Sequence, residues 1–545
     1  MAGSCDGAHG VRVGSMPSSW LAQGAESAGV AIWREEASLS NDLIELTVEQ
    51  VQDAFAKGAV TSEALTQAFL DRIAQIDPRY NSIVFLNPDA LADARASDQR
   101  RSAGKALGPL DGVPVVVKET LDMVGFPTTA GWTLLHSKTG GIDLMPATDS
   151  PVVARMKAAG TVILGKTNVP SLSHTGSHAN DSWAGPTFNS VDRKLLPGGS
   201  SAGTATAVGA SFAVLGLAEE TGGSIQNPAS AQGLPSVKPT FALVPNVGVV
   251  PLSSNRDVVG PIAHCVRDVA LTLDVLAGYT AEDPKTIAGV GHRPKGGYTS
   301  RLSKDALSGK RIGLYGLGWR SLPLSDEATQ LYRGAQDELK QLGAVLVEDP
   351  FKGSGFAALR QPTPPLKEFD ARGMESVPYD IDQYLRHLGP NAALKNFPEF
   401  AEATKAQDPF AKGGVLQYMP NLPDFRACVA DPTRPPRLND FVAAREAYLE
   451  IFNQVMDLEK LDALIFPQMR SELAPIFGSD PILETTVCEI NIAGLPGVTV
   501  PAGYYASGSP FCLIVVGRQW SEADLLAYAY AYEQATHHRR APVLD

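Results

Sequence analysis

The spacing of apolar residues near the start of the chain predicts two amphipathic helices. Thr47, followed three positions later by Gln50, has the form of a capping box, so a helix is expected to begin there. A second helix follows, and one stripe of its surface is apolar: Leu65, Phe69 and Ile73. Both are predicted to pack against a core.

Farther along, apolar runs of strand length alternate with helical patterns. Residues 108–118 predict a turn and then a buried strand that ends on Lys118. Residues 149–160 predict a helix closed by glycine, and residues 161–168 predict the strand after it. A strand, a helix and a strand are expected again within 309–347, and a final helix runs to about residue 535. This alternation is typical of the α/β fold class.

Two glycine-rich turns that carry serines stand at the centre of this pattern, at 197–203 and 220–225. Between them, residues 201–210 are small on every face, which predicts a buried helix, and residues 211–218 predict a buried strand. A helix followed by a strand returns the chain across the core, so we expect the two turns to meet. The second turn can aim successive backbone N–H groups at one point, which is where an oxyanion binds.

These motifs resemble the amidase signature family of serine hydrolases. The resemblance rests on Gly198–Gly203, Thr221–Ile225 and Gly233–Thr240. It continues at Gly112–Lys118 and Gly125–Gly131, and in all it covers roughly residues 45 to 535. It implies an α/β fold in which helices flank a large mixed β-sheet, and hydrolysis of a carboxylic amide to an acid plus an amine or ammonia.

The resemblance also implies a role for each site residue. Ser224 is the expected nucleophile, Ser200 the bridging serine on a cis peptide, and Lys118 the base of a Ser-Ser-Lys triad that works through an acyl-enzyme. Burial favours the neutral amine of a lysine, which suits a base. The oxyanion and substrate contacts are expected from Thr221, Gly222, Gly223 and Ser173.

Three positions depart from the family pattern. Glu119 and Glu220 stand where an Asp is usual, and Gln226 stands where an Arg is usual. We therefore expect a hydrogen bond between a carboxylate and an amide in place of an ion pair beside the oxyanion loop. Because Glu219 and Glu220 adjoin that loop, we also expect neutral substrates to be preferred over acidic ones.

Composition and local patterns predict the domain organisation. Residues 1–40 are rich in Gly, Ser and Ala and predict a disordered tail without a signal peptide. Residues 41–545 are expected to form a single domain. Within it, residues 356–439 are rich in Pro, Phe and Tyr and have no clean period, so they predict an insertion that covers the site and forms an apolar substrate pocket.

Charge and cysteine usage limit the classes of partner and cofactor that are expected. The net charge of −13, from 46 Lys and Arg against 59 Asp and Glu, disfavours nucleic acid and anionic membrane as partners. The five cysteines form no CxxC pair, and no HExxH motif occurs, so no metal and no cofactor is expected. The sequence favours a cytoplasmic enzyme that acts on a small-molecule amide, and a homodimer is compatible with it.

Four other interpretations remain at this point. Gly199–Gly203 fits the GxSxG pattern, which would make Ser201 the nucleophile of an α/β-hydrolase, but residues 193–197 are a poor buried strand. A phosphate-binding loop lacks the Lys-Ser/Thr pair that should follow the glycines. The same triad also serves a carbamate or ester hydrolase, or an amidotransferase subunit that acts with partners on aminoacyl-tRNA.

Overall fold

The computed structural model describes residues 43–359 and 369–544, so the tail expected at residues 1–40 lies outside the described residues. Within the described residues, eleven strands form one mixed sheet in the order β1-β3-β2-β4-β6-β5-β10-β11-β9-β7-β8. The strands are β1 (Ile83–Leu86), β2 (Pro114–Lys118), β3 (Val162–Thr167), β4 (Leu215–Glu220), β5 (Ser236–Lys238), β6 (Val258–Ala263), β7 (Arg311–Leu314), β8 (Val345–Val347), β9 (Ala463–Pro467), β10 (Gly497–Tyr504) and β11 (Pro510–Val516).

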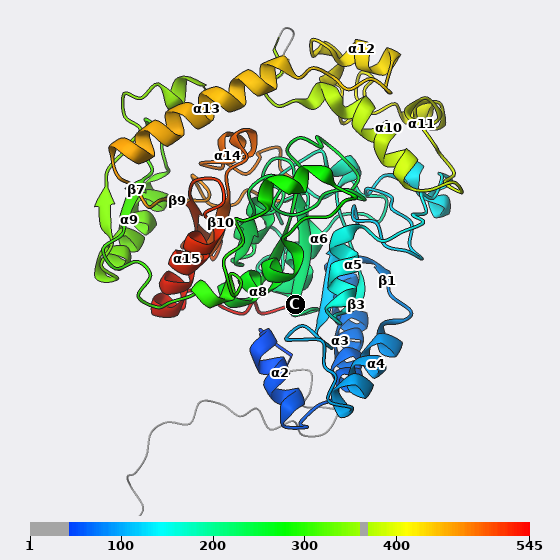
Figure 1. Ribbon diagram of the computed structural model, residues 1–545, viewed down its shortest axis with the longest axis horizontal. Coiled ribbons are helices and arrows are strands. Elements are labelled where there is room, and N and C mark those ends of the chain that lie inside the picture. Colours follow the sequence, from blue (N-terminus) through cyan, green and yellow to red (C-terminus); the bar gives the residue numbers. More distant parts are fainter. Residues whose placement is uncertain (1–42, 360–368, 545) are drawn as a thin grey trace, which may run out of the picture.

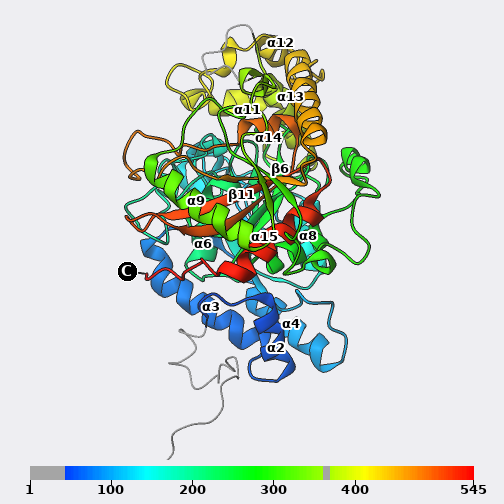
Figure 2. The same cartoon turned by 90° about the vertical axis from the view of Figure 1, so that its left-hand side faces the viewer.

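Helices flank this sheet, as the α/β assignment predicts. They are α2 (Val48–Ala56), α3 (Ser62–Ile76), α4 (Ala90–Ser102), α5 (Pro151–Ala158), α6 (Ala202–Gly209), α7 (Gln226–Ala231), α8 (Val266–Leu276), α9 (Asp326–Gln341), α10 (Val377–His387), α11 (Phe397–Thr404), α12 (Phe425–Ala430), α13 (Asn439–Leu458), α14 (Cys488–Ala493) and α15 (Glu522–Thr536). The predicted capping box at Thr47 and Gln50 is present at the start of α2. Figures 1 and 2 show α2–α4 at one end of the molecule and α11–α13 at the other.

Alternating side chains of the central strands divide the core into two layers. Leu217 of β4 and Val259 of β6 belong to the main apolar cluster, together with residues of α3, α5, α8 and α15. Their neighbours Ala218 and Val258 face the other way and pack against α6 and α7. Successive side chains of a strand point to opposite faces, so the two clusters lie on opposite faces of the sheet. The small residues of α6 let this helix lie close against one of these faces.

The helix and the strand between the two serine turns are confirmed, with a shift at the strand. The helix expected at 201–210 is α6, but the strand expected at 211–218 begins only at Leu215 and ends at Glu220. The chain leaves α6 through Ser211, whose φ is 56°, and the hydroxyl of Ser211 accepts a hydrogen bond from the N–H of Glu45. This turn delays the strand by four residues and carries Glu219 and Glu220 into it.

The described part of the insertion is more regular than its sequence indicates. It contains α10, α11 and α12, which are short and separated by Pro- and Gly-containing turns, so no long helical period appears in the sequence. Their apolar faces form a second cluster with residues of the 130–144 segment, with Leu172 and with Val250 and Leu252. The insertion therefore packs against loops of the main body.

Candidate active site

Three neighbouring parallel strands bring the predicted site residues to one edge of the sheet. β2 pairs in parallel with both β3 and β4, so the carboxyl ends of the three strands lie together. Lys118 is the last residue of β2, and the register that pairs Val117 with Leu217 brings it to the end of β4 that carries Glu219. The carboxyl ends of parallel strands are where ligand sites form in open α/β sheets.

Lys118 is fully buried and makes three hydrogen bonds at this edge. Its Nζ donates to the Oγ of Ser200 over 2.8 Å. It also donates to Oε2 of Glu219 over 2.7 Å and to the backbone oxygen of Glu219 over 3.0 Å. The structure therefore joins Lys118 to Ser200, as the sequence predicts, and adds a buried carboxylate that the sequence analysis did not pair with the lysine.

The two serine turns meet, as predicted. The N–H of Ser201 donates to the backbone oxygen of Ser224 over 3.3 Å. The hydroxyl of Ser201 donates to the backbone oxygen of Glu219 over 3.1 Å. The Gly199–Ser200 peptide bond is cis, as the resemblance implied. No hydrogen bond joins the hydroxyls of Ser200 and Ser224 in this structure, although contacts of this kind often tighten only when substrate binds.

The loop after β4 has a conformation that glycine permits and leaves its backbone N–H groups unbonded. Gly223 has a φ of 96°, and a Cβ there would meet Nδ2 of Asn227 at 2.8 Å, so this position requires glycine. None of the backbone hydrogen bonds in the described part of the chain uses an N–H group of residues 221–224 as donor. These free donors are what an oxyanion hole requires.

The carboxylate of Glu220 anchors the loop of residues 221–224 through hydrogen bonds. It accepts hydrogen bonds from the N–H groups of Ile225 and Gln226, over 2.8 and 3.1 Å. It also accepts from the side-chain amides of Gln226 and Asn491. The expected bond between a carboxylate and an amide at Glu220 and Gln226 is therefore present.

A second carboxyl group, that of Asp257, lies behind the loop. The hydroxyl of Thr221 is 2.5 Å from Oδ1 of Asp257 and 3.3 Å from Oε1 of Glu219. Burial, and then the charge of Glu219, raise the pKa of Asp257 well above its usual range. A protonated Asp257 can donate to Thr221, which leaves the single hydroxyl proton of Thr221 for Glu219.

Ser173 lies on a loop that reaches the site but has no bond to the other predicted residues. Its backbone has a φ of 52°, and its buried Oγ has no hydrogen-bond partner among the described residues. The same loop contacts the first serine turn at Gly176, whose oxygen accepts from the N–H of Gly199 over 3.0 Å. Glu119, the departure next to Lys118, accepts instead from the N–H of Thr129.

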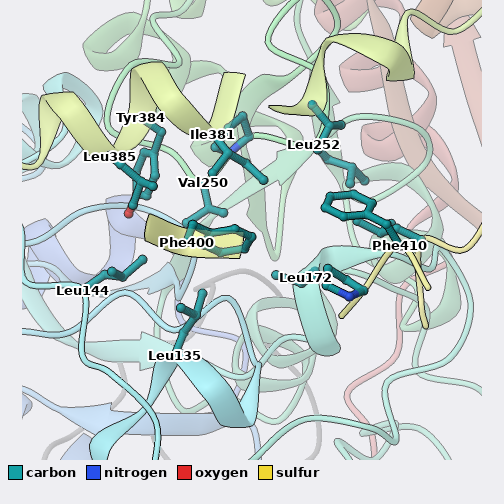
Figure 3. Close-up of a pocket in the computed structure, with 14 residues that line it drawn as sticks. Leu135, Leu144, Leu172, Val250, Leu252, Ile381, Tyr384, Leu385, Phe400 and Phe410 are labelled. Atoms are coloured by element: carbon teal, nitrogen blue, oxygen red, sulfur yellow. The ribbon is translucent and has the colours of Figure 1, made fainter. Parts of the chain in front are cut away.

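An apolar pocket lies between the insertion and the main body (Figure 3). Ile381, Tyr384 and Leu385 of α10 line one side, with Phe400 and Phe410. The main body contributes Leu135, Leu144, Leu172, Val250 and Leu252. Leu172 precedes Ser173, and Leu252 donates its N–H to Asp257, which bonds Thr221. One wall residue, Leu252, is therefore linked to Thr221 through Asp257, while none of Lys118, Ser200 and Ser224 lines the pocket.

Two further observations concern metal ions and membranes. No group of three or more His, Cys, Asp or Glu side chains suited to a metal ion occurs in residues 43–359 and 369–544. None of the helices that the structure describes is long and apolar enough to span a membrane.

Comparisons with known proteins agree with this geometry. The profile of the family described as Amidase matches residues 64–356. A glutamyl-tRNA(Gln) amidotransferase subunit of Moorella thermoacetica is 33% identical over 519 residues, which cover 92% of this chain and 99% of that protein. The native peptide amidase of Stenotrophomonas maltophilia is 31% identical, with a TM-score of 0.76 over 92% of this chain and 99% of that one. A bacterial aryl acylamidase, 22% identical with a TM-score of 0.68 over 91% and 97% of the two chains, shares the fold.

Proposed function

The chain belongs to the amidase family, whose members hydrolyse the C–N bond of amides, and we propose that Ser224 is the nucleophile of this reaction. Ser224 follows two glycines in the loop after β4 and is 5% exposed. Its Oγ attacks the amide carbon, the C–N bond breaks, and an acyl-enzyme forms while the amine leaves with a proton. Water then releases the acid and restores the serine.

Lys118 and Ser200 serve as the proton relay. The bond of 2.8 Å from Nζ of Lys118 to Oγ of Ser200 is the observation that carries this assignment. Ser200 accepts the proton of Ser224 and passes its own proton toward Lys118, and the relay runs in reverse to protonate the leaving amine. Ser201 is a supporting residue, because its hydroxyl is occupied by the backbone of Glu219.

The oxyanion that forms on the amide oxygen is stabilised by backbone donors. This assignment is supported by the N–H groups of Thr221, Gly222, Gly223 and Ser224, which belong to one loop and donate no backbone hydrogen bond in the described structure. Donors fixed before the reaction stabilise the developing charge without reorganising. Loss of one such donor typically raises the activation free energy by about 3 kcal/mol. Ser173 lies on a neighbouring loop and remains a proposed substrate contact.

The substrate that this site fits best is a small-molecule amide or anilide. The apolar pocket between α10, α11 and the 135–144 segment has a volume of about 20 Å³, so it accepts an aliphatic or aromatic group of the substrate only when its lining side chains move apart. Asp380 of α10 accepts from Ser254 over 2.7 Å, and Tyr384 donates to Asp122 over 2.8 Å, so the insertion docks on loops beside the site. These contacts support its predicted role as a cover.

The similarity to amidotransferase subunits favours one alternative, in which partner chains feed the site in the amidation of aminoacyl-tRNA. The discriminating experiment is hydrolysis of a simple anilide by the purified chain alone. We expect turnover that rises toward alkaline pH, is insensitive to chelators and falls by several powers of ten in Lys118→Ala. Absence of turnover of every amide, anilide, carbamate and ester by the chain alone, with activity only after a partner is added, would replace our proposal with the alternative.

A cytoplasmic location and a homodimer stay predictions from the sequence. Fractionation of the native host and light scattering of the purified chain test them.

A further inference from the structure

A buried arginine borders the oxyanion loop. Arg256 lies in the turn before β6, and its side chain is 4% exposed. Its Nη1 is 3.9 Å from the point where a Cβ of Gly222 would stand. A substrate group bound beside the scissile amide is therefore within reach of this guanidinium.

Arg256 and its neighbour Arg372 have N–H groups without partners. Nη2 of Arg256 donates to the sulfur of Met374 over 3.0 Å, and its Nε has no partner. Nε and Nη2 of Arg372 are buried and have none either, while its Cζ lies 5.2 Å from the ring centre of Tyr418. No carboxylate within the described ranges is at ion-pair distance from either guanidinium.

The two nearest acids are already engaged elsewhere. The carboxylate of Asp370 accepts from the backbone N–H groups of Arg372 and Glu375. Asp257 is hydrogen-bonded to the hydroxyl of Thr221 and to the backbone N–H of Ser253, and its raised pKa favours its neutral form. Burial, and then the positive charge of Arg372, lower the pKa of Arg256. A buried guanidinium without an anion is costly, and a second cation beside it adds to that cost.

Glu219 and Glu220, the two acids next to the oxyanion loop, do not disfavour an anion beside Arg256. The charge of Glu219 is compensated by Lys118 in an ion pair of 2.7 Å. Glu220 is surrounded by four N–H donors. The expectation that these two carboxylates favour neutral substrates therefore loses its basis, because both are satisfied within the protein.

We propose that Arg256 and Arg372 form an anion subsite that binds a carboxylate group of the substrate next to the scissile amide. The proposal rests on the amide hydrolysis proposed above and deepens it. A guanidinium presents its N–H donors as a planar fork that matches a carboxylate, and an anion there satisfies donors that the protein leaves free. The preferred substrate is then an amide that also carries a carboxylate, on its acyl or its amine side.

The experiment compares matched amides with and without a carboxylate. The monoanilides of succinic and glutaric acid are paired with the anilides of butyric and valeric acid, and 3- and 4-acetamidobenzoate are paired with acetanilide. We expect at least one acidic member to have the higher kcat/KM. That advantage should fall about 10- to 100-fold in Arg256→Gln and in Arg372→Gln, because a charge-assisted hydrogen bond is lost. Arg386→Gln, which removes a half-exposed arginine of α10 paired with Asp382, should keep it.

Two outcomes overturn the proposal: a neutral member preferred in every pair, or an acidic advantage unchanged in both variants. Arg372 is only partly buried, so Arg372→Gln decides the matter if Arg256→Gln fails to fold, as judged by thermal melting. If no amide at all is hydrolysed, the proposed function fails, and calorimetry with glutarate and benzoate on the full chain tests the subsite alone. Millimolar or tighter binding that both variants lose supports the subsite, and its absence in the wild type refutes it.

Discussion

Oε2 of Glu219 lies 2.7 Å from Nζ of Lys118, and both side chains are almost wholly buried. This ion pair places a carboxylate directly against the proposed base. A lysine that already holds its proton cannot accept another from Ser200, so the proton on Lys118 must move first. Glu219 is the nearest group that can take it, and we expect the pair to act together as the base.

Replacing Glu219 tests this partnership. In Glu219→Gln the ammonium form of Lys118 loses its anion, so the neutral amine is favoured and the rate should rise at a lower pH than in the wild type. The plateau rate should fall about 100-fold, because Lys118 stays as the proton acceptor but loses the carboxylate that holds its Nζ beside Ser200. The measurement is kcat/KM against pH on one neutral anilide.

Glu220→Gln is the matched control, because it removes the neighbouring buried carboxylate of β4, which bonds no lysine. It should slow the reaction without moving the pH profile. A profile of Glu219→Gln that keeps both the shape and the plateau of the wild type would show that Glu219 only packs against Lys118.

Replacing Ser224 and replacing Ser201, one serine from each turn, should affect activity differently. Ser224→Ala should abolish turnover and leave the melting temperature close to that of the wild type, because the side chain is small and the loop is held by Glu220. Ser201→Ala should keep much of the activity, because it removes only the bonds of the hydroxyl to the backbone oxygen and N–H of Glu219. Kinetics of both variants on one anilide, with circular dichroism, decide between them. An inactive Ser201→Ala beside an active Ser224→Ala would restore the GxSxG interpretation.

The local motifs of the site were predictable from the sequence, and its charge network was not. Glycine patterns and apolar runs predicted that Ser201 would meet the Ser224 turn, because these features act over short distances. The ion pair of Glu219 depends on the register of β4 against β2, and the strand began four residues later than its apolar run. Arg256 gave no signal, because an isolated arginine in a turn is usually solvated.

Asp122 should make the stability of the protein depend on pH. Its Oδ1 accepts from Thr128 and from Tyr384 of the insertion, both over 2.8 Å, and burial raises its pKa to about 7. A carboxyl group whose pKa is raised in the folded state stabilises the fold at low pH, and that contribution is lost as the pH rises from about 4 to about 7. The free energy of unfolding should therefore fall over this window, by on the order of 4 kcal/mol from this group.

Asp122→Asn isolates this effect, because the amide mimics the neutral acid at every pH. Urea unfolding at pH 5 and pH 8 should show the variant gaining stability relative to the wild type at the higher pH. Asp53→Asn is the control, because it removes an exposed carboxylate 3.8 Å from Lys57, and exposed pairs contribute little. A constant difference between wild type and Asp122→Asn at both pH values would contradict the assignment.

The apolar pocket predicts which substrates the insertion selects. Phe400 of α11 lines the pocket, and its ring centre lies 6.0 Å from that of Trp132 in the main body. Shortening it to Leu should lower kcat/KM for an anilide with a large apolar acyl group about tenfold relative to acetanilide, since a few methylene-sized contacts are lost. Phe400→Leu is preferred to Phe400→Ala because it keeps most of the buried volume and hence the fold. Phe477→Ala, at a ring that is 70% exposed, should leave the ratio unchanged. If Phe400→Leu lowers the melting temperature but not the ratio, the pocket is packing between the insertion and the main body, and the substrate group binds elsewhere.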